Sequence, residues 1–113
     1  MKIITNEISI KELREMSVKI FGNLVKAVVD IEKKIMAVDA DLHSDLEALL
    51  LEKGSAQKNL WGINIYPEMA GSDFVEFDSM INLRPSQNNR SRGVDDIEIQ
   101  KKILEITGKL VKK

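Results

Sequence analysis

The stretch from Leu60 to Arg92, LWGINIYPEMAGSDFVEFDSMINLRPSQNNRSR, decides how the rest of the chain is interpreted. It contains the only Trp, the only Tyr and both prolines of the sequence. Leu60–Tyr66 has the pattern of a strand, and Pro67 ends it because proline cannot donate to a sheet ladder. Phe74–Arg84 is predicted to be the returning strand. The stretch therefore predicts a β-hairpin.

Alternating positions along these two strands predict one apolar face and one polar face. Trp61, Ile63 and Ile65 lie on one side, where a core can cover them. The other side carries polar side chains from both strands, namely Asn64, Tyr66, Glu76, Asp78, Asn82 and Arg84. An antiparallel sheet commonly leaves one face to solvent, so a solvated surface and a binding surface are both open interpretations. Asn64 and Asn82 favour binding, because Asn is poor in strands and broken local rules gather at functional sites.

A polar loop follows the second strand and is rich in Arg and amide side chains: Arg84, Gln87, Asn88, Asn89, Arg90, Ser91 and Arg92. The planar fork of Arg fits a carboxylate or phosphate with two hydrogen bonds. Asn and Gln both donate and accept. The loop is predicted either to hold an anionic ligand or to be a disordered surface turn. No Gly-rich phosphate fingerprint is present, and no cofactor is indicated.

Length, net charge and composition limit the class of protein. A length of 113 residues predicts a single domain over residues 1–113. The net charge of −1 implies no general attraction to nucleic acid or to acidic membranes. No apolar run approaches 18 residues and no signal-peptide core is present, so neither a membrane span nor secretion is expected. The absence of Cys excludes a disulfide scaffold. A cytoplasmic location is the default expectation.

The remaining segments predict an α+β fold. A capping box at Ser9 begins one helix, Leu42–Lys53 forms a second, and Asp95 with Asp96 caps a third. The expected strands outside the first hairpin are Lys2–Thr5, Leu24–Ile31 and Ile35–Val38. The order (β)-α-β-β-α-β-β-α predicts two layers, a four- or five-stranded, mostly antiparallel sheet with three helices. Lys26 and Asp30 join the polar face if both hairpins share one sheet.

A second candidate site lies in the acidic stretch before and within the second helix. His43 and Glu47 are four residues apart and share one helical face, with Asp45 nearby. They are candidates for acid–base chemistry or for metal ligation, with Asp30, Asp39 or Asp78 as a further ligand. The alternative is a capping His beside ordinary acids of a first helical turn.

Several motifs resemble a small prokaryotic family that is filed as a domain of unknown function. They are His43-x-Asp45-x-Glu47, Gly54-Ser55-x-Gln57, Leu60-Trp61-Gly62-x-Asn64, Ile81-Asn82-x-Arg84-Pro85 and Asn89-Arg90. The resemblance covers nearly the whole chain. It implies a cytoplasmic single-domain protein and attaches no activity to it.

Three functions follow as hypotheses. The first is a binding module for an anionic small ligand, a nucleotide or a nucleic-acid strand, with the candidate residues Asn64, Tyr66, Asp78, Asn82, Arg84, Asn89 and Arg90. The second is a protein-interaction or homodimerisation module that uses a free edge strand. The third is a metal- or carboxylate-dependent hydrolase in which His43 is a ligand or general base, with Glu47 and either Asp78 or Asp30 nearby.

Overall fold

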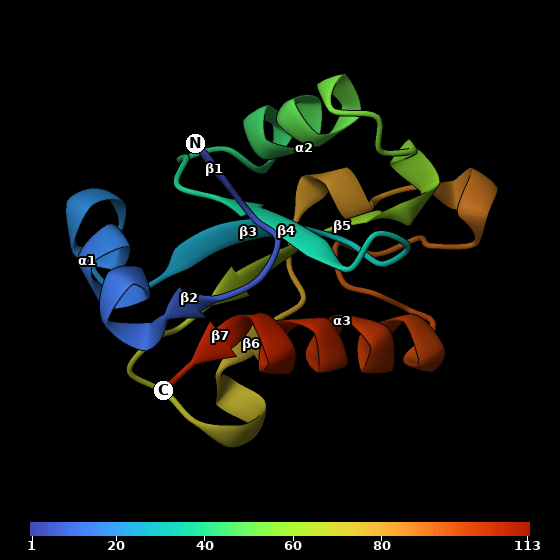
Figure 1. Cartoon of the computed structure of the whole chain (residues 1–113). Helices are drawn as coiled ribbons and strands as arrows, with labels where there is room; N and C mark the ends of the chain where they lie inside the picture. The colour runs from blue at the N-terminus through green and yellow to red at the C-terminus, as the bar shows by residue number, and fades with distance from the viewer.

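A computed structural model describes residues 1–113 and contains one five-stranded sheet (Figure 1). Its strands are β1 (Lys2–Ile4), β3 (Val25–Asp30), β4 (Ile35–Val38), β5 (Leu60–Ile65) and β6 (Val75–Glu76). They lie in the order β1-β4-β3-β5-β6, and every neighbouring pair is antiparallel. With three helices added, the predicted α+β class and its five-stranded antiparallel sheet are confirmed.

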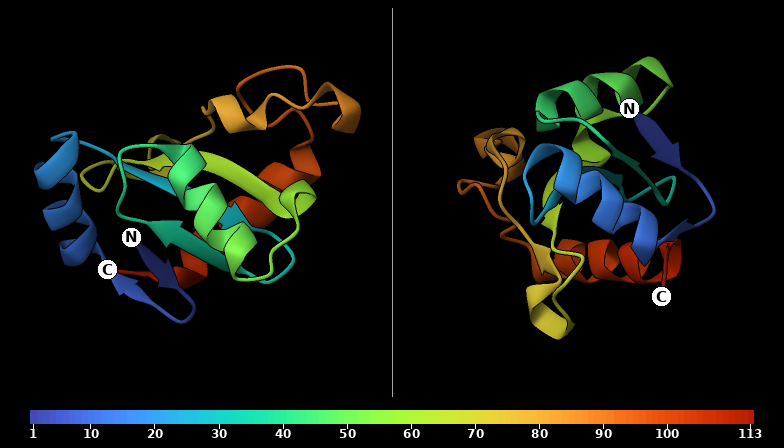
Figure 2. Two further views of the ribbon diagram at one scale, coloured as in Figure 1. Left: turned by 90° about the horizontal axis from the view of Figure 1, so that it is seen from above. Right: turned by 90° about the vertical axis from the view of Figure 1, so that its left-hand side faces the viewer.

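The helices cover both faces of this sheet. They are α1 (Ile10–Ile20), α2 (His43–Glu52) and α3 (Ile97–Leu110). The larger core joins α1 and α3 to one sheet face, which includes Val29 and Ile63. A smaller core joins Leu46 and Leu50 of α2 to the opposite face. Figure 2 (right) shows α2 and α3 on opposite sides of the sheet. The prediction of two layers was therefore wrong, because α2 adds a third.

Capping explains why two of the helices begin where they do. The Ser9 hydroxyl accepts from the Glu12 amide at 3.1 Å, as the capping box predicts. Asp96 caps α3 in the same way, accepting from the Glu98 amide at 2.9 Å. Helix α2 differs, because Leu42 occupies its N-cap and no side chain caps its first turn. The capping-type residue Asp41 is exposed and lies one residue before this position.

The predicted strand Phe74–Arg84 is wrong beyond its first residues. Only Val75–Glu76 pairs with β5, and Met80–Asn82 is a short 3-10 helix. The Asn82 side chain replaces the missing strand neighbour, because its Oδ1 accepts from the Gly62 amide at 2.9 Å. Its Nδ2 donates to the Gly62 carbonyl at 3.0 Å. One buried side-chain amide thus satisfies both backbone groups that a continued strand would have paired.

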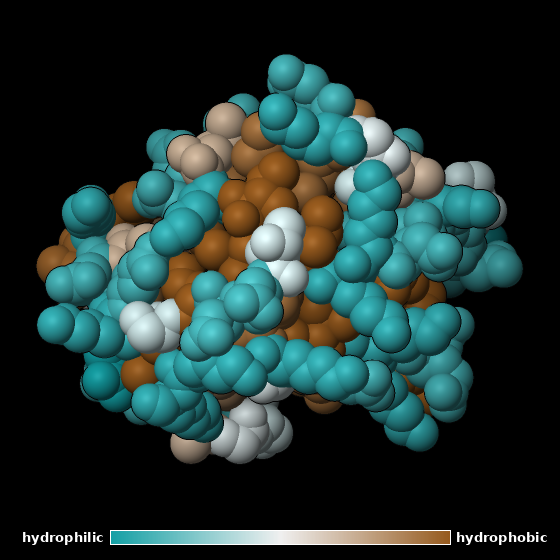
Figure 3. Space-filling view, viewed as in Figure 1, coloured by the Kyte–Doolittle hydropathy of each residue, from teal (hydrophilic) through white to brown (hydrophobic).

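A second, two-stranded sheet was not predicted. β2 (Ile8–Ser9) and β7 (Val111–Lys112) pair in parallel and bring the start of α1 beside the end of α3. Segments of two residues are too short to show alternation. The predicted edge strand at the N-terminus is confirmed as β1. Figure 3 shows apolar residues gathered near the centre of the face that is seen in Figure 1. No helix of the chain is long and apolar enough to cross a membrane.

Gly62 permits the close approach of the segment that carries Ser79. A Cβ at position 62 would lie 2.5 Å from the Ser79 Cβ. We expect Gly62→Ala to lower the free energy of unfolding by about 2–3 kcal/mol, because an overpacked site must shift. Gly108→Ala is the matched control, since nothing lies within 4 Å of its new Cβ, and it should raise stability by about 0.5–1 kcal/mol. Urea unfolding of both variants measures the difference, and equal stabilities would contradict the packing.

Candidate functional site

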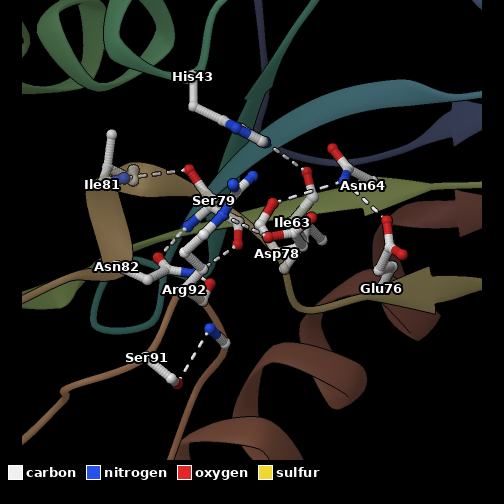
Figure 4. A network of polar contacts seen from close by, with 12 residues as sticks. His43, Ile63, Asn64, Glu76, Asp78, Ser79, Ile81, Asn82, Ser91 and Arg92 are labelled. Carbon is white, nitrogen blue, oxygen red and sulfur yellow. Dashed lines mark hydrogen bonds and ion pairs between the residues drawn. The ribbon is translucent and has the colours of Figure 1, made fainter.

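A polar cleft of about 290 Å³ opens between the start of α2 and the sheet. The elements that form it are α2, β3, β5 and the segment from residue 78 to residue 92 (Figure 4). The lining residues are Lys26, Leu42, His43, Ser44, Asn64, Asp78, Ser79, Met80, Ile81 and Arg92. The cleft therefore brings together residues that are far apart in the sequence.

His43 points from the first turn of α2 toward the sheet and is only 8% exposed. Its Nε2 lies 2.8 Å from the Ile63 carbonyl, which accepts only, so Nε2 carries the proton and donates. Burial lowers the pKa of His43 below its ordinary value of 6.5, against the raising effect of the bond to Ile63. The imidazole is therefore neutral at pH 7, and its Nδ1 is an acceptor without a partner in the protein.

Asn64 forms part of the cleft floor and is 7% exposed. Its Nδ2 donates to Glu76 Oε1 at 2.9 Å and approaches the Asp78 carbonyl at 3.4 Å. Its Oδ1 is buried and has no hydrogen-bond partner. The opposite amide orientation would place this oxygen against the Glu76 carboxylate, so the neighbours fix the assignment. Asn64 thus keeps one buried acceptor oxygen that no group of the protein satisfies.

Tyr66 lies beside this floor and outside the cleft. Its hydroxyl donates to Glu76 Oε1 at 2.9 Å, the same oxygen that accepts from Asn64. This hydrogen bond raises the pKa of the Tyr66 phenol. Tyr66 and Asn64 therefore hold the Glu76 carboxylate from two sides.

The charged groups of the cleft are Lys26, Asp78 and Arg92. Arg92 Nε lies 2.8 Å from Asp78 Oδ1, and both side chains are about half exposed. An exposed ion pair of this kind contributes little to stability. Lys26 pairs in register with Asn64 on the neighbouring strand, so the expectation that it joins the polar face is met. Asp30 lies at the other end of β3, where its carboxylate caps the turn and accepts from Ser55 at 2.6 Å.

The first turn of α2 adds backbone donors to the cleft. The first amides of a helix have no intrahelical acceptor, and no side chain caps this turn. His43 and Ser44 line the cleft, and neither amide has a partner in the protein. A helix N-terminus also carries partial positive charge. This end of the cleft therefore suits an anionic group.

Three predicted ligand-binding residues are used inside the protein instead. Asn82 is fully buried against Gly62. Arg84 donates to the carbonyls of Gln57 and Leu60, and its guanidinium lies 4.1 Å from the centre of the Trp61 ring. Burial lowers the pKa of this guanidinium, against the raising effect of the nearby Glu47 carboxylate.

Asn89 is the third of these residues and holds the polar loop in shape. Its Nδ2 lies 2.7 Å from the Asn82 carbonyl and 2.9 Å from the Gly93 carbonyl. Its Oδ1 accepts from the Asp95 amide at 2.8 Å. Arg90 is exposed, does not line the cleft, and uses its backbone amide to bond Asp95. The loop is therefore an ordered structure built on one buried amide.

The predicted metal site is not assembled. No group of three or more His, Asp or Glu side chains is placed to hold a metal ion. Asp45 is exposed, and Glu47 lies outside the cleft, half-buried, with its Oε2 buried and unpaired. Of the residues that the hydrolase hypothesis named, only His43 and Asp78 line the same cleft.

The sequence interpretation missed part of the lining. Leu42, Ser44, Ser79, Met80 and Ile81 were not among the candidates, and Arg92 was noted only as part of the loop. One signal was present for α2, because Leu42 stands where a capping Ser, Thr, Asp or Asn is preferred. Nothing in the sequence marked Met80 and Ile81, since they were placed in a strand.

These features define a small α+β domain with a polar cleft between a helix N-terminus and one sheet face. Residues 2–110 match the model of a family described as a protein of unknown function, DUF5674, and the chain belongs to this family. The resemblance inferred from the motifs is thereby confirmed at the level of the family. No curated protein and no solved structure matches the chain.

The lowered pKa of His43 predicts a pH dependence of stability. Below pH 6.5 the unfolded imidazole takes up a proton first. The free energy of unfolding should therefore fall as the pH decreases from 6.5 to the folded pKa, by about 1.4 kcal/mol per unit of lowering. His43 is the only His, so its ring resonances in NMR report this pKa directly. His43→Gln should lack this slope, and a folded pKa at or above 6.5 would contradict the burial.

A second prediction concerns Asn89. Asn89→Ala should lower the free energy of unfolding by about 3 kcal/mol, because it leaves buried backbone groups without partners. Asn88→Gly is the matched control: Asn88 has a positive φ of 60°, which Gly adopts freely, and its side chain is exposed. Thermal or urea unfolding checks both, and a stable Asn89→Ala protein would show that the loop holds its shape by other contacts.

Proposed function

We propose that the protein is a cytoplasmic ligand-binding module and that its cleft holds a small anionic ligand. The observation that carries the proposal is the uncapped first turn of α2, whose His43 and Ser44 amides open onto a cleft that also has Lys26 and Arg92. Free helix amides together with Arg form a common anion site. Asn64 supports the proposal independently, because its buried unpaired oxygen lies in the floor of the same cleft.

The charge arrangement explains how an anion would be accommodated. Arg92 is bonded to Asp78 through Nε alone, so its two terminal nitrogens remain free to donate. Lys26 reaches the same cleft from β3. An anion that enters would meet two cations and the positive end of a helix against one carboxylate, which is a net favourable field.

The size of the cleft favours a small ligand over a nucleic-acid strand. A volume of about 290 Å³ is at the lower limit of ordinary ligand pockets. Binding of a strand would need a positively charged track along the surface. Arg84 is buried in internal hydrogen bonds, and the chain carries a net charge of −1. Of the three predicted kinds of ligand, we therefore propose the anionic small molecule, bound in the cleft.

The test is a titration with inorganic phosphate at constant ionic strength, followed by NMR of the backbone amides. We expect the largest shifts at His43 and Ser44. Arg92→Ala should weaken binding about tenfold, close to 1.4 kcal/mol, because it removes a cation and leaves Asp78 unpaired. Arg90→Ala is the matched control, since Arg90 is an exposed Arg of the same loop that does not line the cleft. Saturable shifts elsewhere, or none at all, would refute the proposal.

A further inference from the structure

We infer that the natural ligand carries hydroxyl groups beside its anionic group, as a phosphorylated sugar does, and that the buried Asn64 Oδ1 accepts from one of these hydroxyls. The inference rests on the proposed function and narrows it to one class of ligand. It follows from the two kinds of groups that the cleft offers. One end presents donors and positive charge, and the floor presents acceptors.

The acceptors of the floor are fixed in orientation. Nδ2 of Asn64 is committed to Glu76, whose carboxylate is also held by Tyr66, so the amide cannot rotate without placing two oxygens together. Nε2 of His43 is committed to the Ile63 carbonyl, so Nδ1 remains the acceptor. Figure 4 shows both anchoring bonds and the two side chains on the same side of β5. Two acceptors thus stand ready without a donor from the protein.

An anion alone does not satisfy these acceptors. A buried amide oxygen without a donor is costly, and native proteins rarely leave one unpaired. The dianionic group of a phosphate monoester brings only further acceptors. Lys26, the cation nearest in register, has its ammonium 5.2 Å from the centre of the Phe21 ring and makes no hydrogen bond to Asn64. A ligand hydroxyl that reaches this oxygen would supply the missing donor.

The dimensions favour a short ligand. The anionic group is expected at the amides of His43 and Ser44, and the hydroxyls are expected toward Asn64 on β5. About 290 Å³ accommodates a pentose phosphate more readily than a complete nucleotide with its base. Leu42 and Met80 are exposed at the cleft and give its rim an apolar lining that suits the carbon faces of a sugar.

The test compares two ligands with the same anionic group. Ribose 5-phosphate and pentyl phosphate are titrated into the wild-type protein by calorimetry, with inorganic phosphate as the reference. We expect ribose 5-phosphate to bind at least tenfold more tightly than pentyl phosphate, because a site built for hydroxyls rejects the analogue that lacks them. The comparison uses the unmodified protein, so it does not depend on whether a variant folds.

A variant of Asn64 tests whether this residue causes the preference for ribose 5-phosphate. Asn64→Leu should bind the two ligands with equal affinity, whereas Arg90→Ala, which alters an exposed residue outside the cleft, should keep the preference for ribose 5-phosphate. Equal binding of both ligands by the wild-type protein would overturn this inference and leave the proposed function intact. A preference that survives in a folded Asn64→Leu protein would also overturn it. Failure of all three probes to bind would instead refute the proposed function.

Discussion

The contact on which the rest of the structure depends is the pairing of the Asn82 side chain with the backbone of Gly62. Two hydrogen bonds of 2.9 and 3.0 Å join one amide group to both polar groups of one residue in β5. The contact requires Gly at position 62, because the neighbouring Ser79 leaves no room for a Cβ. It ends the pairing of β6 after two residues and turns the chain over the sheet face. The cleft exists because this turn occurs.

Further buried polar contacts extend from this pair and place Arg92. The Asn82 Nδ2 also donates to the Arg92 carbonyl at 3.0 Å, and the Ser79 amide donates to the same carbonyl at 2.9 Å. Asn89 then bonds the Asn82 carbonyl and closes the loop. The backbone of Arg92 is thus fixed while its side chain stays half exposed beside Asp78. Because its backbone is fixed, the Arg92 side chain would need little reordering to bind an anion, which favours affinity.

The sequence predicted the regular elements well because their signals are local. Alternation identified Leu60–Tyr66, Ile35–Val38 was predicted as the returning strand of a hairpin, and the caps at Ser9 and Asp96 identified two helix starts. The prediction of a strand over Phe74–Arg84 was wrong beyond its first residues. Alternation cannot distinguish a strand from an irregular segment in which a side-chain amide replaces the hydrogen bonds of a strand.

The candidate site was predicted in part for a related reason. Residue type marked Asn82 as unusual in a strand, and the Arg- and amide-rich loop marked Arg84 and Asn89. Such polar residues serve equally well as internal structural contacts. Whether a buried amide faces backbone or an open cleft depends on tertiary packing, which no local pattern encodes. Asn64 and His43 were recognised, and both line the cleft. Arg92 was passed over in favour of Arg84, because nothing in the sequence tells which Arg of a loop folds inward.

Two unfavourable features of the fold occur in the same place, and this coincidence supports a functional reading of the cleft. The first turn of α2 lacks a side-chain cap, which typically costs about 1 kcal/mol. The Asn64 oxygen beside it is buried without a donor, which costs about 1–3 kcal/mol. Folding stability alone would select against both, since a Ser or Asp at position 42 is the preferred cap. Proteins tolerate such local costs where binding recovers them. Under the proposed function, the ligand would supply both the missing cap and the missing donor.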